Sequence, residues 1–137
     1  MFSRILVPVD LEHAGELQKA LEAAADIAKR SSAVVRFVTA AGAGPSAVAA
    51  SLDEHRSKLE ALARDQAEAH GLSTESRLYE SHDVAAELDS LLLKAIEDAS
   101  ADLVVAGSHS PNVIDYVWRG HAASLATHAP CSVLVIR

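Results

Sequence analysis

The stretch "RILVPVD", residues 4–10, is the strongest structural signal in the chain. Its apolar residues follow one another without alternation, and the run ends in an acid. A strand that is apolar on both faces is typical of the centre of a parallel sheet, where helices cover both sides. The stretch therefore predicts a central strand with Asp10 at its carboxyl end.

Similar apolar runs alternate along the chain with segments in which apolar residues recur at helical spacing. Strands are predicted at residues 33–41, 72–80, 102–107 and 131–137. The run 72–80 is the most polar of them and is expected near a sheet edge. Helices are predicted at residues 14–29, 51–70, 84–99 and near 122–128. This alternation indicates an α/β fold, with a mainly parallel sheet and helices on both faces.

The composition limits the size and the partners of the protein. A chain of 137 residues without a linker or an internal repeat predicts a single domain over residues 1–137. Its net charge of −7 argues against nucleic-acid and membrane-surface binding, which need a basic face. No signal peptide precedes Ile5, and no apolar run approaches the length of a membrane span. We therefore expect a cytoplasmic protein.

The carboxyl ends of the strands are the expected place for a ligand, at the point where the winding of the chain reverses. If the first strand lies beside the fourth predicted strand, Asp10 and Gly107 face each other across a crevice. The carboxylate of Asp10 could accept hydrogen bonds from ribose hydroxyls or lie near a magnesium ion. It could also cap the helix that follows, and the two roles are compatible.

A long connection, "GSHSPNVIDYVWRGH" at residues 107–121, follows the fourth predicted strand. Connections in such folds usually have roughly 2–6 residues, and longer ones are often functional. A glycine lets a ligand approach the backbone, and the next helix offers N–H groups to a phosphate. The connection could wrap a phosphate chain, or its apolar residues could simply pack on the core. It contains neither the Walker pattern nor GxGxxG.

The seven histidines do not predict a metal site, because no pair has suitable spacing with a third ligand nearby. His13, His55 and His70 are expected to be solvated.

The sequence also contains no obvious catalytic set. The single cysteine, Cys131, excludes an internal disulfide and is expected to be a small core residue rather than the partner of His128 in catalysis. Hydrolysis of a bound ligand would need a group that activates water, and only His109 or Asp10 could do so. We therefore expect slow turnover at most.

The chain resembles the universal stress protein family over essentially its whole length. The resemblance rests on "ILVPVD" (5–10), "DLVVAGSHS" (102–110) and "HAPCSVLVIR" (128–137), the last of which is nearly a signature of the family. It implies a five-stranded parallel sheet in the order 3-2-1-4-5 with helices on both faces, of the adenine nucleotide α-hydrolase-like type. Many members bind ATP, and others of the same fold do not.

The ATP-binding members share a pattern of Gly, two residues, Gly, nine residues, Gly, and then Ser or Thr. In this chain Gly107 and Gly120 match the first and third glycines, whereas Ser110 and His121 replace the second glycine and the hydroxyl residue. Aligned backwards from "HAPCSVLVIR", the pattern places Arg119 at the third glycine and Gly120 at the hydroxyl residue. The phosphate motif is partly kept in either alignment.

Carried over position by position, the resemblance implies a nucleotide site and a function. The expected site residues are Pro8, Asp10, Ala40, Ala106, Gly107, His109, Ser110, Arg119, Gly120, His121 and Ala122. The ligand would be ATP, with or without Mg²⁺, or a related adenine nucleotide that regulates a stress-response protein. The alternative is a dimeric interaction protein of the same fold that binds no nucleotide.

The last predicted strand is the sheet edge in the order 3-2-1-4-5. Val133 and Val135 would point to one face, and Leu134 and Ile136 to the other. An apolar edge without proline or a central charge is a template for pairing with another chain. We therefore expect a homodimer through this strand, with a monomer as the alternative.

Overall fold

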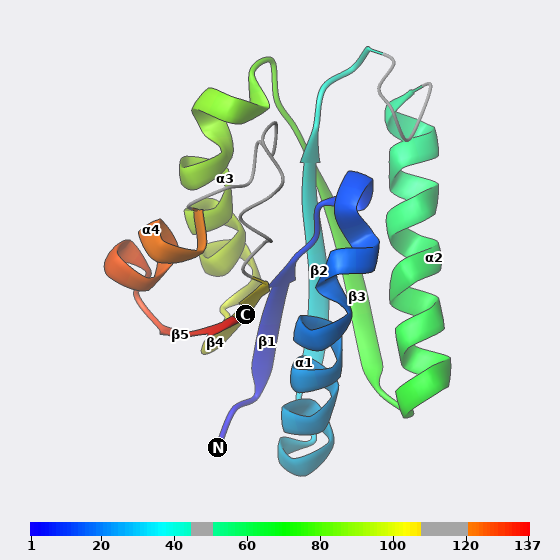
Figure 1. The fold of residues 1–137 in the computed structure, drawn as a ribbon, viewed down its shortest axis with the longest axis vertical. Coiled ribbons are helices and arrows are strands. Elements are labelled where there is room, and N and C mark those ends of the chain that lie inside the picture. The colour runs from blue at the N-terminus through cyan, green and yellow to red at the C-terminus, as the bar shows by residue number, and fades with distance from the viewer. Residues whose placement is uncertain (45–50, 108–120) are drawn as a thin grey trace.

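The structure is a computed structural model, and it describes residues 1–44, 51–107 and 121–137. Strands and helices alternate along the chain (Figure 1). The strands are β1 (Arg4–Pro8), β2 (Val34–Ala41), β3 (Ser73–Glu80), β4 (Leu103–Gly107) and β5 (Ser132–Ile136). The helices are η1 (Leu11–Leu17, a 3₁₀ helix), α1 (Gln18–Ser31), α2 (Leu52–His70), α3 (Val84–Ala99) and α4 (His121–His128). None of the helices described is both long enough and apolar enough to span a membrane.

The strands form a parallel sheet in the order β3-β2-β1-β4-β5, so the predicted fold and strand order are confirmed. β1 is the central strand, and its Ile5 is in register with residues of both β2 and β4. Near the amino end of β1, the carboxylate of Asp102 accepts hydrogen bonds from the backbone N–H groups of Ser3 and Arg4, at 2.8 and 3.0 Å. The side chain of Asp102, the residue before β4, therefore links the start of β4 to the start of β1.

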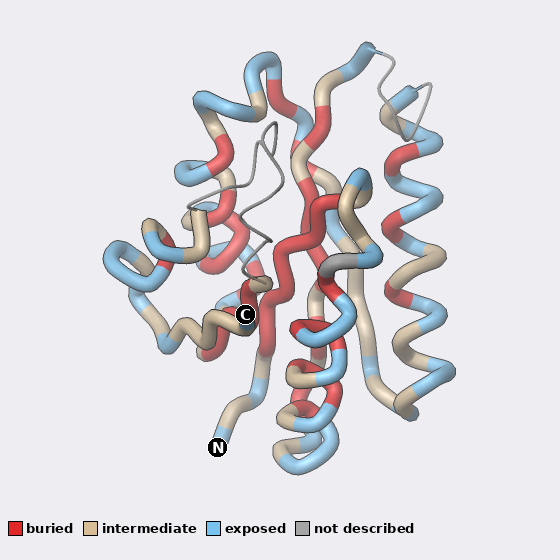
Figure 2. The backbone as a smooth tube through the Cα atoms, in the orientation of Figure 1, coloured by how far each residue is buried: buried red, intermediate tan, exposed pale blue. Residues whose placement is uncertain are grey.

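Helices cover both faces of the sheet and bury two apolar cores. Ile5 and Val7 of β1 pack with α1 and α2 in one of them, which we call the α1–α2 core, and Phe37 of β2 belongs to it. Leu6 packs with α3 and α4 in the other, the α3–α4 core. Figure 2 shows the buried backbone running along β1 through the middle of the molecule. The uninterrupted apolar sequence of β1 therefore corresponds to a strand covered on both faces.

The segment after β1 differs from the prediction. The sequence predicts one helix over residues 14–29, but the chain first forms η1 and continues as α1 only from Gln18. Asp10 caps η1 by accepting a hydrogen bond from the backbone N–H of Glu12. The backbone of His13, with φ −124° and ψ 31°, then interrupts the helical geometry. The aspartate cap starts helical structure earlier than the apolar periodicity indicates.

The prediction that the three histidines are solvated is wrong for His55, which is only 7% exposed. His55 lies four residues before Leu59 and eight before Ala63, and both of these residues are buried. Side chains four positions apart lie on the same face of a helix, so His55 belongs to the buried face of α2. His13 and His70 are half-buried rather than fully solvated.

The two edge strands differ in character. β3 is polar and mostly half-buried, and it lies at an edge as predicted. In β5, Leu134 and Ile136 pack against the α1–α2 core and Val133 packs against the α3–α4 core. The side chains from Val133 to Ile136 all remain partly exposed. β5 therefore keeps apolar surface on both faces at the edge of the sheet.

Candidate functional site

The carboxyl ends of β1 and β4 lie beside each other in the sheet. η1 leads from β1 to the face that carries α1, whereas α4 covers the opposite face before β5. The winding of the chain thus reverses between β1 and β4, and open α/β sheets bind their ligands at such a point. A pocket opens at this position.

Six of the predicted site residues line this pocket. They come from the ends of β1 and β4 and from the start of α4, and they are Pro8, Asp10, Ala106, Gly107, His121 and Ala122. Ala40 is not among the lining residues, because its side chain packs against the α3–α4 core. His109, Ser110, Arg119 and Gly120 lie outside the residues that the structure describes.

Sequence reasoning missed three leucines that also line the pocket. They are Leu17 at the end of η1, Leu92 of α3 and Leu125 of α4. All three are buried, with exposed fractions between 2% and 5%. Helical periodicity marks such residues as core residues, but it does not show that a core residue also borders a crevice.

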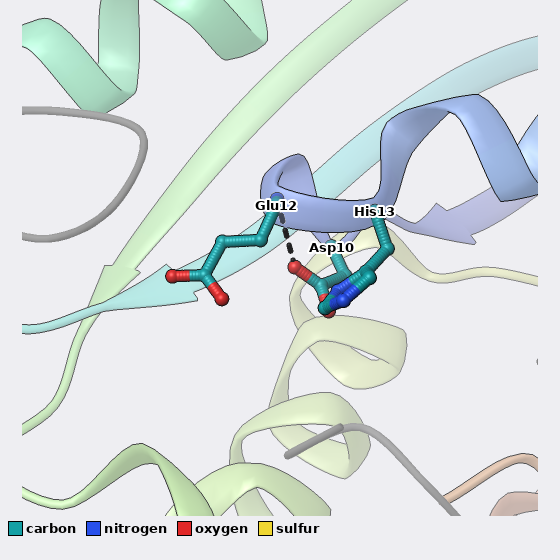
Figure 3. Close-up of side chains that lie close together, drawn as sticks. All are labelled: Asp10, Glu12 and His13. Atoms are coloured by element: carbon teal, nitrogen blue, oxygen red, sulfur yellow. Dashed lines mark hydrogen bonds and ion pairs between the residues drawn. The ribbon is translucent and has the colours of Figure 1, made fainter. Parts of the chain in front are cut away.

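Asp10 is the buried polar group of the pocket, with 7% of its surface exposed. One carboxylate oxygen accepts a hydrogen bond from the backbone N–H of Glu12 at 2.9 Å. The other oxygen lies 3.0 Å from Nδ1 of His13, and Figure 3 shows the two side chains beside each other. The capping role considered for Asp10 is therefore present in the structure. Each carboxylate oxygen has two acceptor positions, so both retain capacity for a ligand.

Asp10, Glu12 and His13 also form a group of possible metal ligands. Ligand atoms of the three side chains all lie within 4.8 Å of one another. Figure 3 shows the carboxylate of Glu12 on one side of Asp10 and the ring of His13 on the other. Carboxylates suit magnesium and calcium, whereas imidazole favours transition metals. From the sequence, Asp10 is considered as a possible neighbour of magnesium and the histidines as pairs with a third ligand nearby, and the pattern Asp-x-Glu-His at residues 10–13 joins these two observations in one group.

Gly107 has a structural role besides the expected approach of a ligand. A Cβ atom at this position would lie 2.7 Å from the Cδ2 atom of Leu17. The glycine therefore leaves room for Leu17, which closes the α1–α2 core beneath the pocket. A side chain at Gly107 would require the end of the Leu17 side chain to move, so the glycine contributes to packing besides any contact with a ligand.

His121 is held against the pocket by an acidic partner. It is the first residue of α4, and its ring nitrogen Nδ1 forms a hydrogen bond or ion pair with the Oδ1 atom of Asp89 in α3. The side chain of His121 is 15% exposed and that of Asp89 is 51% exposed. Sequence patterns do not indicate this partner, because the two residues are 32 positions apart.

The pocket is narrow, with a volume of about 20 Å³, which corresponds to roughly one water molecule. A larger cleft of about 420 Å³ lies between η1, α1 and α2, and its lining includes the apolar residues Leu11, Leu21 and Leu62. The smaller pocket is the better candidate, because a buried carboxylate, two strand ends and the start of a helix converge on it.

The model of the universal stress protein family matches residues 1–137 of the chain. The chain belongs to the universal stress protein family. The resemblance stated from the sequence motifs is thereby confirmed. The family's phosphate pattern is partly kept in this chain, with Ser110 in place of its second glycine.

Solved structures of universal stress proteins have the same fold. One from Archaeoglobus fulgidus in complex with dAMP is 18% identical to this chain, with a TM-score of 0.73 and 98% of each chain covered. Another, in complex with cAMP, is 21% identical, with a TM-score of 0.70 and with 99% of this chain and 97% of that chain covered. A third, from Arabidopsis thaliana with AMP bound, is 15% identical, with a TM-score of 0.63, and the match covers 98% and 90% of the two chains.

Cys131 of this universal stress protein is poorly suited to nucleophilic catalysis. Burial raises the pKa of the Cys131 thiol, and the negative charge of Asp102 raises it further. The thiolate, which is the reactive form, is therefore disfavoured. Nδ1 of His128 lies 3.0 Å from the carbonyl oxygen of Ser124, to which it can donate a hydrogen bond. These contacts favour a structural role for both residues.

Proposed function

We propose that this universal stress protein binds ATP or a related adenine nucleotide as a regulatory ligand in the cytoplasm, in the pocket between β1 and β4. The observation that carries the proposal is the convergence of Asp10, Gly107 and His121 on one pocket at the reversal of the sheet. The family membership and the nucleotides in the three related structures support it.

Each part of the pocket has a role in this proposal. Asp10 accepts hydrogen bonds from the ribose hydroxyls while it continues to cap η1. The start of α4, at His121, meets the phosphates, because a helix N-terminus attracts anions. A divalent cation that accompanies ATP would find the side chains of Glu12 and His13 beside Asp10. The family resemblance assigns Ala40 to the adenine, although Ala40 does not line the pocket.

Isothermal titration calorimetry tests this function directly. We expect AMP or ATP, with Mg²⁺ added for ATP, to bind with a Kd at or below about 1 mM, because the ribose and phosphate contacts add to the burial of the base. Adenine alone should bind more weakly, since it lacks both groups that Asp10 and His121 would contact. The absence of heat with millimolar AMP and ATP, together with the absence of nucleotide in mass spectra of the purified protein, would contradict the proposal.

The alternative function is that of a dimeric interaction protein without nucleotide. The narrowness of the pocket and the packing role of Gly107 are the observations that favour it. Dimerisation is common to both functions in our proposal. The partly exposed apolar side chains of β5, at the sheet edge, support an antiparallel pairing of this strand with a second copy.

Changing Val135 to Lys is expected to weaken the dimer at least about tenfold. The substitution places a charge in the middle of the proposed interface, and lysine is one of the residues that protect natural edge strands from pairing. It keeps the backbone hydrogen bonds between β5 and β4, which a proline could remove. Sedimentation velocity over a range of protein concentrations measures the effect.

The matched control for this dimer test is Ser76→Lys, which puts the same charge on β3 at the opposite edge of the sheet. This variant should dimerise like the parent protein. If Val135→Lys leaves the dimer intact, the interface lies elsewhere. A parent protein that is monomeric at about 100 μM would contradict the proposed dimer.

A further inference from the structure

The pair formed by Asp89 and His121 connects α3 to the wall of the pocket. His121 lines the pocket together with Asp10 and Gly107, whereas Asp89 does not line it. The contact joins the Oδ1 atom of Asp89 to Nδ1 of His121. Asp89 contacts His121 and not the pocket itself, so its contact with the site runs through the histidine ring.

A carboxylate at Nδ1 determines how a histidine ring can act. The Nδ1–H group donates to the carboxylate, which restrains the orientation of the ring and leaves Nε2 as the other polar atom. When Nε2 is protonated as well, the ring carries a positive charge, and Nε2–H donates a charge-assisted hydrogen bond to a phosphate oxygen. Such bonds are shorter and stronger than neutral ones. A ribose or a base gains much less from the same group, because neither carries a negative charge.

We propose that Asp89 is a positioning residue that holds His121 against the phosphate of the bound ligand, so that the site selects phosphorylated adenine nucleotides over adenosine. This inference rests on the proposed nucleotide-binding function. In the alignment of the family pattern that starts at Gly107, His121 stands in place of Ser or Thr, and the inference explains how the chain could keep a phosphate donor there.

A purely structural role for the pair would be to tie α4 to α3. Apolar packing already provides that connection, since Leu125 of α4 is 2% exposed and lies in the α3–α4 core together with Leu88 and Leu92 of α3. The position of α4 should therefore survive the loss of the pair. The two roles differ in what the loss of the pair would change. Loss of a link between the helices would lower stability and the affinity for all ligands together. Loss of a positioned phosphate donor would lower only the preference for phosphorylated ligands.

The experiment measures the Kd values of AMP and adenosine by calorimetry for the parent protein and for Asp89→Asn. The variant keeps the shape of the side chain and removes its charge. We expect the affinity for AMP to fall about tenfold and that for adenosine to stay within about twofold, because only AMP carries the charged group. The matched control is Glu97→Gln, which removes one negative charge from an exposed position on the same helix and should change neither value.

A double-mutant cycle then separates positioning from general loss of structure. His121→Gln should lower the preference for AMP to a similar extent, and adding Asp89→Asn to it should have little further effect, since both act through one ring. A parent protein that binds no AMP would overturn the proposed function, and this inference with it. If the parent protein binds AMP, an unchanged preference in Asp89→Asn, or an equal loss for both ligands, would overturn the inference alone.

Discussion

Replacing Asp10 with Ala is expected to weaken adenine nucleotide binding by about 10- to 100-fold. The carboxylate is 7% exposed and lines the pocket, and hydrogen bonds to a charged group contribute roughly 1.5–3 kcal/mol. The variant also loses the cap of η1, which should lower the free energy of unfolding by about 1 kcal/mol. Calorimetry with AMP and urea denaturation measure the two effects separately.

Asp83→Ala is the matched control for this variant. Asp83 caps α3 in the same way, by accepting a hydrogen bond from the backbone N–H of Ala86 at 3.2 Å, but it does not line the pocket. It should therefore lose a similar amount of stability and retain the affinity for AMP. Equal affinities of Asp10→Ala and the parent protein would remove Asp10 from the binding site.

Replacing Phe37 with Ala is expected to lower the free energy of unfolding by about 3–5 kcal/mol. Phe37 is 1% exposed in the α1–α2 core, and truncating a buried phenylalanine removes apolar contacts and leaves a cavity. The loss is a large part of the roughly 5–15 kcal/mol that stabilises a typical domain. Urea denaturation followed by far-ultraviolet circular dichroism measures it.

Phe2→Ala provides a comparison with the same change of side chain at a half-buried position. It should cost clearly less than Phe37→Ala, because less apolar surface is lost and water can fill the space. A loss below about 1 kcal/mol for Phe37→Ala would mean that β2 does not carry the core in the way described.

The sheet could be predicted from the sequence because its central strands are covered on both faces. β1 and β4 are therefore apolar runs, and a change of residue type marks where they stop, with Asp10 two residues after β1 and Gly107 as the last residue of β4. The strand order, in contrast, followed from the family resemblance, because periodicity does not identify the neighbours of a strand. The prediction for His55 is wrong because it follows from the polar residue type alone, whereas the position of His55 on α2 puts it on the buried face of the helix.

The candidate site could be predicted only in part. Residues at strand ends, such as Asp10 and Gly107, were found because the reversal of the sheet brings known positions together. The family resemblance alone assigns Ala40 to the adenine, and in the structure Ala40 is partly buried and packs against the α3–α4 core. Asp89 could not be predicted as the partner of His121, because a contact between two helices depends on the angle at which they cross. The apolar periodicity of each helix does not determine that angle.

The central place of β1 has a consequence for how the protein is made. The hydrogen bond from the N–H group of Arg4 to Asp102 joins residues 98 positions apart. Most of the chain must therefore be synthesised before β4 can pair with β1. During synthesis, β1, β2 and β3 can assemble with α1 and α2 while Leu6 still exposes its side of the strand. Closing so long a loop slows folding. The nascent chain therefore passes through a stage in which one apolar face of the sheet is uncovered. A chaperone would find the largest apolar surface at this stage. The two walls of the pocket meet only when β4 pairs with β1 and the stage ends.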